Sequence, residues 1–198
     1  MDSRRELADG YLGIAHGRAG AYYSTLMWCE SVEDILPPTI QEGLDQLAAY
    51  AQHDARGMRW PIRRAPAKAK FMDSWCHGNP GYVHLWTAAY RCLREPRYLE
   101  IAAKAARGIG KGTDRVGTLC CGDAGRAYAM IEMHRHTGER EWLTRSRHLA
   151  EAAMAKSQRD LRFSYSLLKG QLGAALLMED LKCAERASFP LFGKDFRG

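Results

Sequence analysis

The chain has 198 residues, of which 46% are hydrophobic, and it carries a net charge of +6 at pH 7. This size supports one sizeable core, so we expect residues 1–198 to form one domain or part of one. No apolar run approaches the ~20 residues that span a bilayer, and MDSRRELADG at the N-terminus lacks a signal-peptide stretch, which excludes a membrane span and predicts a cytoplasmic protein.

Four segments along the chain share the pattern Gly-x-x-Gly followed by an apolar run. They are HGRAG from His16, HGNPG from His77, CGDAG from Cys121 and KGQLG from Lys169. Glycine at these positions allows positive φ angles and close approach of backbones, so we expect each segment to be a loop that leads into a helix.

Amphipathic helices are predicted between these loops. Thr39 and Glu42 have the spacing of a capping box, Pro96 suits the first residue of a helix, and Gly138 suits a helix end. The runs 82–93 and 172–181 are apolar around more of their circumference, so we expect the helices after the glycine loops to form a buried inner layer. Strand patterns are almost absent, and the predicted class is all-α.

The segment 56–70, RGMRWPIRRAPAKAK, contains no acidic residue and reads as a basic loop. It would attract an acidic peptide by its charge, or it is simply a solvated loop without a specific partner. Because no nucleic-acid-binding motif surrounds it and the remaining charge is mixed in sign, we do not expect nucleic-acid binding.

Three of the six cysteines lie at glycine loops: Cys76 in SWCHG, and Cys120 and Cys121 in TLCCGD. Thiolates select zinc, and three protein ligands leave a fourth position open for a substrate, as in catalytic zinc sites. By spacing alone, buried free thiols remain the alternative. The other cysteines lie away from these loops and read as ordinary thiols, namely Cys29, Cys92 and Cys183.

In chain order, GIAHGRAG, SWCHGNPG, LCCGDAG and SLLKGQLGAALLMEDL resemble the AHG, W-C-x-G, C-H/C-G and terminal glycine motifs of the LanC-like family, the lanthionine synthetase cyclases. The resemblance covers nearly the whole chain. It implies an α/α toroid of helical hairpins and a Zn2+ ion bound by Cys76, Cys120 and Cys121. Many members have Cys-His at the adjacent pair, where this chain has Cys-Cys.

The resemblance also implies an enzymatic activity. A cysteine thiol of a precursor peptide would add to a dehydrated Ser or Thr residue, dehydroalanine or dehydrobutyrine, and close a thioether ring. His16 matches the AHG histidine, which implies a catalytic acid or base, while His77 is a candidate hydrogen-bond donor near the zinc and Asp123 a candidate helix cap. The alternatives are addition of glutathione to dehydroamino acids and a non-catalytic, zinc-containing peptide-binding or scaffold protein.

Full LanC-like proteins are longer and close a ring of more hairpins than four glycine loops account for. We therefore expect an incomplete toroid, the C-terminal portion of the ring, that lacks its N-terminal part. The family's catalytic aspartate, upstream of the AHG motif, has no counterpart here. A missing N-terminal half or a dehydratase is the expected protein partner, and the first and last inner helices should expose apolar flanks.

Overall fold

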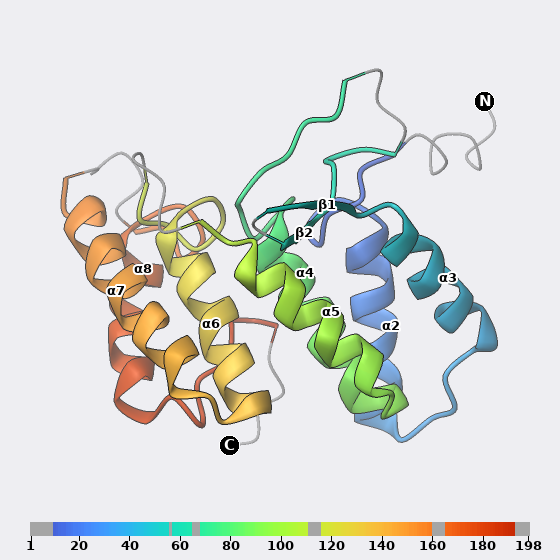
Figure 1. Ribbon diagram of the computed structural model, residues 1–198. Coiled ribbons are helices and arrows are strands. Elements are labelled where there is room, and N and C mark those ends of the chain that lie inside the picture. Colours follow the sequence, from blue (N-terminus) through green and yellow to red (C-terminus); the bar gives the residue numbers. More distant parts are fainter. Residues whose placement is uncertain (1–9, 56, 65–67, 111–115, 160–164, 193–198) are drawn as a thin grey trace. The chain divides into compact units, whose positions relative to one another are not determined.

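The computed structural model describes residues 10–55, 57–64, 68–110, 116–159 and 165–192. The chain divides into two compact units, Met1–Gly108 and Ile109–Gly198. The described residues are mostly helical (Figure 1), and none of their helices is both long and apolar enough to span a bilayer.

The first unit contains four helices and a short hairpin among its described residues: α2 (Arg18–Val32), α3 (Pro38–Ala49), β1 (Gln52–Asp54), β2 (Gly57–Arg59), α4 (Asn79–Leu93) and α5 (Pro96–Arg107). Helix α2 packs against α3 and α4, and α4 packs against α5. The antiparallel hairpin pairs Gln52 with Arg59 and places β2 against α5. Its strands have three residues each, too short to give an alternating pattern, so the sequence did not predict them.

Proline residues begin both amphipathic helices of the first unit. Pro96 occupies the first helical position, as predicted, and Pro38 does so as well; a missing backbone N–H costs nothing there. The predicted capping box is wrong: Pro37 is the N-cap of α3, Thr39 lies inside the helix, and no side chain caps it. Two consecutive prolines fix the backbone at this helix start, so no side-chain oxygen is needed there.

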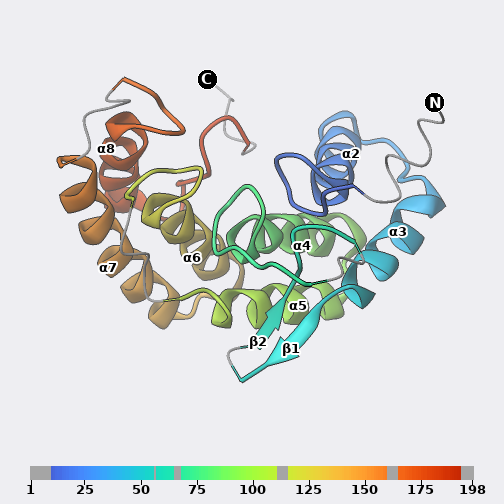
Figure 2. The ribbon, with the colours of Figure 1, turned by 90° about the horizontal axis from the view of Figure 1, so that it is seen from above.

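The second unit contains α6 (Asp123–Thr137), α7 (Arg140–Ser157), α8 (Gln171–Asp180) and a 3₁₀ turn over Leu181–Cys183 within its described part. Helices α6 and α7 run side by side with α8 against them (Figure 2). Gly138 ends α6 with a φ of 72°, which confirms the predicted helix boundary.

Burial separates the two kinds of helix. Residues 79–89 of α4 and 123–133 of α6 are buried all round, as predicted for inner helices. Helix α7 buries one stripe, the predicted one: Trp142, Ser146, Leu149, Ala150 and Ala153.

The all-round burial predicted for α8 is wrong, because Leu172 and Leu176 are exposed. Trp28 on α2 is 66% exposed. The expected exposure of apolar flanks on these two helices is thereby confirmed.

The glycines before α4 and α6 serve close approach. Gly78 and Gly122 have φ angles of −127° and −119°, so neither uses the positive φ that the sequence allowed. A Cβ atom on Gly78 would overlap the carbonyl oxygen of Met72, and one on Gly122 would overlap that of Val116. Only glycine therefore lets the loop fold back against the start of its helix.

Candidate metal centre

Cys76 lies in the loop before α4, in the first unit, and is 4% exposed. Its carbonyl oxygen accepts a hydrogen bond of 3.2 Å from the Ala15 backbone N–H, and its Sγ lies 3.3 Å from Ser74 Oγ. A Cβ atom on Gly13 would meet the backbone of Cys76 and His77. The first glycine loop is thus packed directly against the cysteine of the second.

His77, which follows Cys76 in the first unit, adjoins the side chains of His16 and Tyr11. The ring centroid of His77 lies 5.3 Å from that of His16 and 5.0 Å from that of Tyr11. His16, the predicted catalytic residue, is exposed. Burial lowers the pKa of His77 and outweighs the opposing effect of Cys76, while His16 lowers that pKa further. The His77 ring is therefore preferentially neutral.

Cys120 and Cys121 lie in the loop before α6, in the second unit. Their Sγ atoms are 3.5 Å apart; Cys120 is half-buried and Cys121 is exposed. The Cys120 backbone N–H donates to the carbonyl oxygen of Leu168 at 2.9 Å, so the KGQLG loop supports the cysteine loop. An adjacent pair presented in this way offers two sulfur atoms from one short turn.

Asp123, which follows this pair, is fully buried in an ion-pair network. Its carboxylate accepts hydrogen bonds from Lys156 Nζ and, at 3.3 Å, from Arg126 Nη1. The prediction that Asp123 caps free amides is wrong, because no side chain caps α6. The first amides of this helix instead donate to loop carbonyls, such as that of Val116, and the carboxylate is left to balance two cations.

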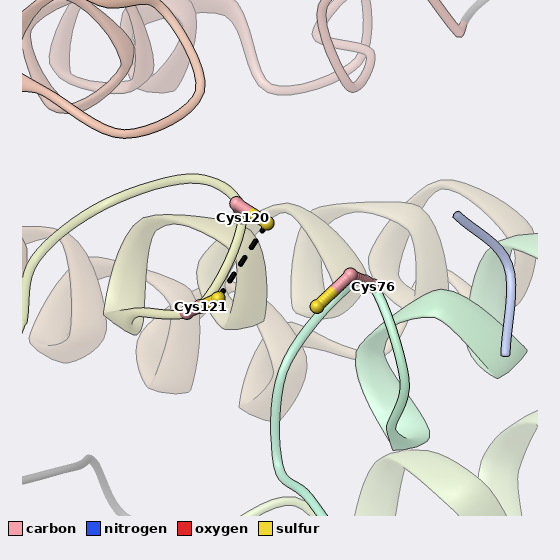
Figure 3. A group of neighbouring side chains, drawn as sticks. All are labelled: Cys76, Cys120 and Cys121. Atoms are coloured by element: carbon pink, nitrogen blue, oxygen red, sulfur yellow. Dashed lines mark hydrogen bonds between the residues drawn. The ribbon is translucent and has the colours of Figure 1, made fainter. Parts of the chain in front are cut away.

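Figure 3 draws Cys120 and Cys121 on the loop before α6, joined by their contact, and Cys76 on the loop before α4. Cys76 in the first unit and the Cys120–Cys121 pair in the second are candidate ligands of a metal ion. Two thiolates bound tetrahedrally to zinc at about 2.3 Å lie about 3.8 Å apart. The 3.5 Å between the Cys120 and Cys121 sulfurs fits that geometry closely. Soft sulfur donors also suit zinc chemically.

The remaining cysteines lie elsewhere. Cys29 is buried in α2, Cys92 is half-buried with its Sγ 3.6 Å from the Leu26 carbonyl oxygen, and Cys183 is exposed. None of the six cysteines, all of which are described residues, forms a disulfide bond. Their placement agrees with the interpretation of these three as ordinary core or surface thiols.

Sequence reasoning missed a set of side chains at the first position of the inner helices, which we call the tether residues: Asn79, Asp123 and Gln171. Asn79 Nδ2 donates to the Met58 and Ala105 carbonyl oxygens, each at 2.8 Å. Gln171 Nε2 donates to the Ser157 carbonyl oxygen at 2.9 Å. Each tether residue bonds to the last turn of an outer helix. A polar residue after the first glycine of every motif was the available signal.

Comparison with known protein families gives a match over residues 2–192 to the model of the lanthionine synthetase C-like protein. A relative from Danio rerio, "Glutathione S-transferase LANCL1", is 27% identical over 194 residues, which cover 92% of this chain and 45% of that protein.

Among solved structures, nisin cyclase matches with a TM-score of 0.70 and 16% identity, over 88% of this chain and 47% of the cyclase chain. This likeness confirms the predicted all-α class and α/α toroid fold. The chain spans about half the length of both relatives.

Proposed function

Because the chain belongs to the lanthionine synthetase C-like family, we propose that Cys76, Cys120 and Cys121 bind one Zn2+ ion and that the chain supports addition of a thiol to a dehydroamino acid. The observation that carries the proposal is the 3.5 Å spacing of the Cys120 and Cys121 sulfurs, which suits one metal ion. The third thiol, Cys76, also lies on a motif loop and is a candidate ligand of the same ion.

The chemical obstacle is the thiol of the substrate. A free cysteine has a pKa of about 8.5, so only a few per cent is thiolate at pH 7. Zinc, when bound, supplies a fourth coordination position at which a thiol is deprotonated. Three cysteine thiolates would donate more charge to a bound metal ion than a Cys-Cys-His set, so a substrate thiolate at the fourth position would be more nucleophilic.

The chain's own residues then handle the proton. Attack forms a carbon–sulfur bond at the β-carbon, breaks the carbon–carbon π bond and leaves an enolate, which takes a proton at the α-carbon. His16 is exposed and adjoins the His77 ring beside Cys76, so it can reach a bound substrate. We assign the protonation to His16, because imidazole transfers protons near neutral pH.

The leading substrate is a cysteine-containing precursor peptide with dehydrated Ser or Thr residues, in which the addition is intramolecular and closes a thioether ring. The fold shared with nisin cyclase supports this choice. The second candidate is glutathione, which the name of the Danio rerio relative favours. In both reactions a cysteine thiol, of the peptide itself or of glutathione, adds to a dehydroamino acid.

A third candidate function depends on a partner. The chain spans about half the length of its relatives. We propose that residues 1–198 form one LanC-like domain that acts together with a partner carrying the other part of the toroid, or with a dehydratase. In the absence of such a partner, the chain would act as a zinc-containing peptide-binding protein without turnover.

Metal content tests the site. We expect about one zinc per chain in the purified protein and well under half of that after Cys121→Ala, because two thiolates bind zinc far more weakly than three. Cys183→Ala is the matched control, since Cys183 is also exposed but is not one of the three candidate ligands. A folded wild-type chain without zinc would contradict both enzymatic candidates.

Mass spectrometry separates the candidates. Incubation with a dehydrated, cysteine-containing peptide should remove the free thiol without changing the mass if the chain is a cyclase, because cyclisation is an isomerisation. If the chain instead adds glutathione to dehydroamino acids, the mass of the peptide should rise by one molecule of glutathione when glutathione is supplied. Retained zinc with neither change supports the peptide-binding function.

A further inference from the structure

Ile62 and Arg63 of the basic segment are held by Tyr11 and Leu12, which precede the first glycine loop. The Leu12 backbone N–H donates to the Ile62 carbonyl oxygen at 2.9 Å, and Tyr11 forms an antiparallel bridge with Arg63. The Ile62 N–H in turn donates to the Lys70 carbonyl oxygen at 2.8 Å. These contacts fix the backbone of Arg63 beside the loop that carries His16.

The side chain of Arg63 lies at one end of a row of neighbouring rings. Its Cζ lies 4.3 Å from the centroid of the Tyr11 ring, which itself lies 5.0 Å from the His77 ring. His77 directly follows Cys76 and adjoins His16. A single aromatic ring therefore separates a fixed guanidinium from the histidine pair beside the proposed zinc ligand.

Within the described part of the chain, no hydrogen-bond acceptor occupies the side-chain N–H groups of Arg63. Stacking occupies the face of a guanidinium, whereas its N–H groups point outward in the plane, where they can grip a carboxylate with two parallel hydrogen bonds. Arg63 is exposed, and no carboxylate among the described residues forms an ion pair with it. Arg59, by contrast, is paired with Asp54 at 3.4 Å.

We propose that Arg63 binds a carboxylate of the thiol substrate and thereby selects acidic substrates. This inference rests on the proposed function and names the substrate class of that site. Two sources share the chemistry: glutathione, which has two carboxylates, and a peptide with an acidic residue or C-terminus next to its reacting cysteine. An extended tripeptide spans about 10 Å, a length suited to reach past one aromatic ring.

The charge around Arg63 favours the same class. Every charged residue of the segment 56–70 is basic, and the whole chain is positive. Clustered charge of one sign raises the local concentration of an oppositely charged ligand and is screened by salt. A neutral substrate gains nothing from this field.

Binding of S-methylglutathione to the full chain tests the inference without turnover, because the methyl group removes the thiol that zinc would bind. We expect the acid to bind about tenfold or more tightly than its dimethyl ester, as a charge-assisted hydrogen bond allows. Arg63→Ala should reduce this preference by about tenfold, and Arg63→Lys should give an intermediate value, since lysine keeps the charge but loses the fork.

Arg64→Ala is the matched control. Arg64 is exposed and its Cζ lies 5.5 Å from the Tyr50 ring, away from Tyr11, so its loss removes the same charge without touching the row. If it weakens binding as much as Arg63→Ala does, or if acid and ester bind equally well, the inference is overturned.

A second arm identifies the source of the carboxylate. If Arg63 accepts a peptide carboxylate, a peptide with S-methylcysteine next to Glu should bind more tightly than the same peptide with Gln. A preference shown by S-methylglutathione alone assigns the site to glutathione. Zinc content of Arg63→Ala should equal that of the wild type, so failure of this inference is distinguishable from failure of the metal site.

Discussion

The N-termini of α4 and α6 share one backbone arrangement but are tethered to their outer helices by different chemistry. At α4, the neutral amide of Asn79 donates to two buried carbonyl oxygens. At α6, the charged Asp123 balances Lys156 and a buried Arg126. The glycines fix the geometry in both cases, so the tether is free to be neutral or ionic provided every buried group is satisfied.

Removing the shared glycine geometry should have the largest effect. Gly78→Ala and Gly122→Ala place a methyl group on a backbone carbonyl, which only a backbone shift can relieve. We expect each to lower the free energy of unfolding by about 3 kcal/mol or more, measured by urea denaturation. Gly138→Ala is the control: nothing lies within 4 Å of its Cβ position, so its φ of 72° alone should cost about 1 kcal/mol. Equal losses at all three positions would contradict the role of close approach.

The ionic tether should be the next most sensitive feature. Asp123→Asn preserves the side-chain volume but removes the carboxylate that pairs with Arg126, whose side chain is 2% exposed. We expect a loss of about 3 kcal/mol in the free energy of unfolding, because removing one partner of a buried ion pair is costly.

Glu179→Gln provides an exposed control for this substitution, because the pair of Glu179 with Lys182 lies at the surface. Its expected effect is within about 0.5 kcal/mol. The double variant Asp123→Asn with Arg126→Met should recover part of the loss. Full stability of the single Asp123→Asn variant would show that the carboxylate does not balance Arg126.

The neutral tether should respond less. Asn79→Ala removes the donor to the Met58 and Ala105 carbonyl oxygens, and we expect a loss of about 2 kcal/mol. Gln171→Ala removes one bond from a less buried side chain and should cost about 1 kcal/mol. Thermal unfolding of both variants gives the order, and a larger loss at Gln171 would reverse the expected dependence on burial.

The sequence predicted the helices that have a periodic apolar pattern and the helix ends that are marked by proline or glycine. Pro96 and Gly138 marked helix ends correctly, and the apolar runs of α4 and α6 identified buried helices. Patterns of this kind reflect local geometry and solvent exposure, which the order of residues records directly.

Features that depend on distant partners were not predicted. Thr39 had the spacing of a cap, but the backbone of Pro37 and Pro38 begins the helix without it. Asp123 had the position of a cap, but its carboxylate accepts a hydrogen bond from Lys156, which lies 33 residues away in the sequence. The three cysteines were found because adjacent thiols and motif loops are visible in sequence, whereas the contact of Arg63 with Tyr11 brings together residues 52 positions apart.

The hydrogen bond from the Cys120 N–H to the Leu168 carbonyl oxygen gives the fourth glycine loop a use that requires no particular side chain. Substitutions at Leu168 leave that backbone oxygen in place, so the hydrogen bond tolerates a change of side chain. A residue inserted or deleted between Ser166 and Gly170 would move the oxygen away from Cys120. A relative that has lost this hydrogen bond is therefore recognised by an alignment gap in the loop, and not by a substitution.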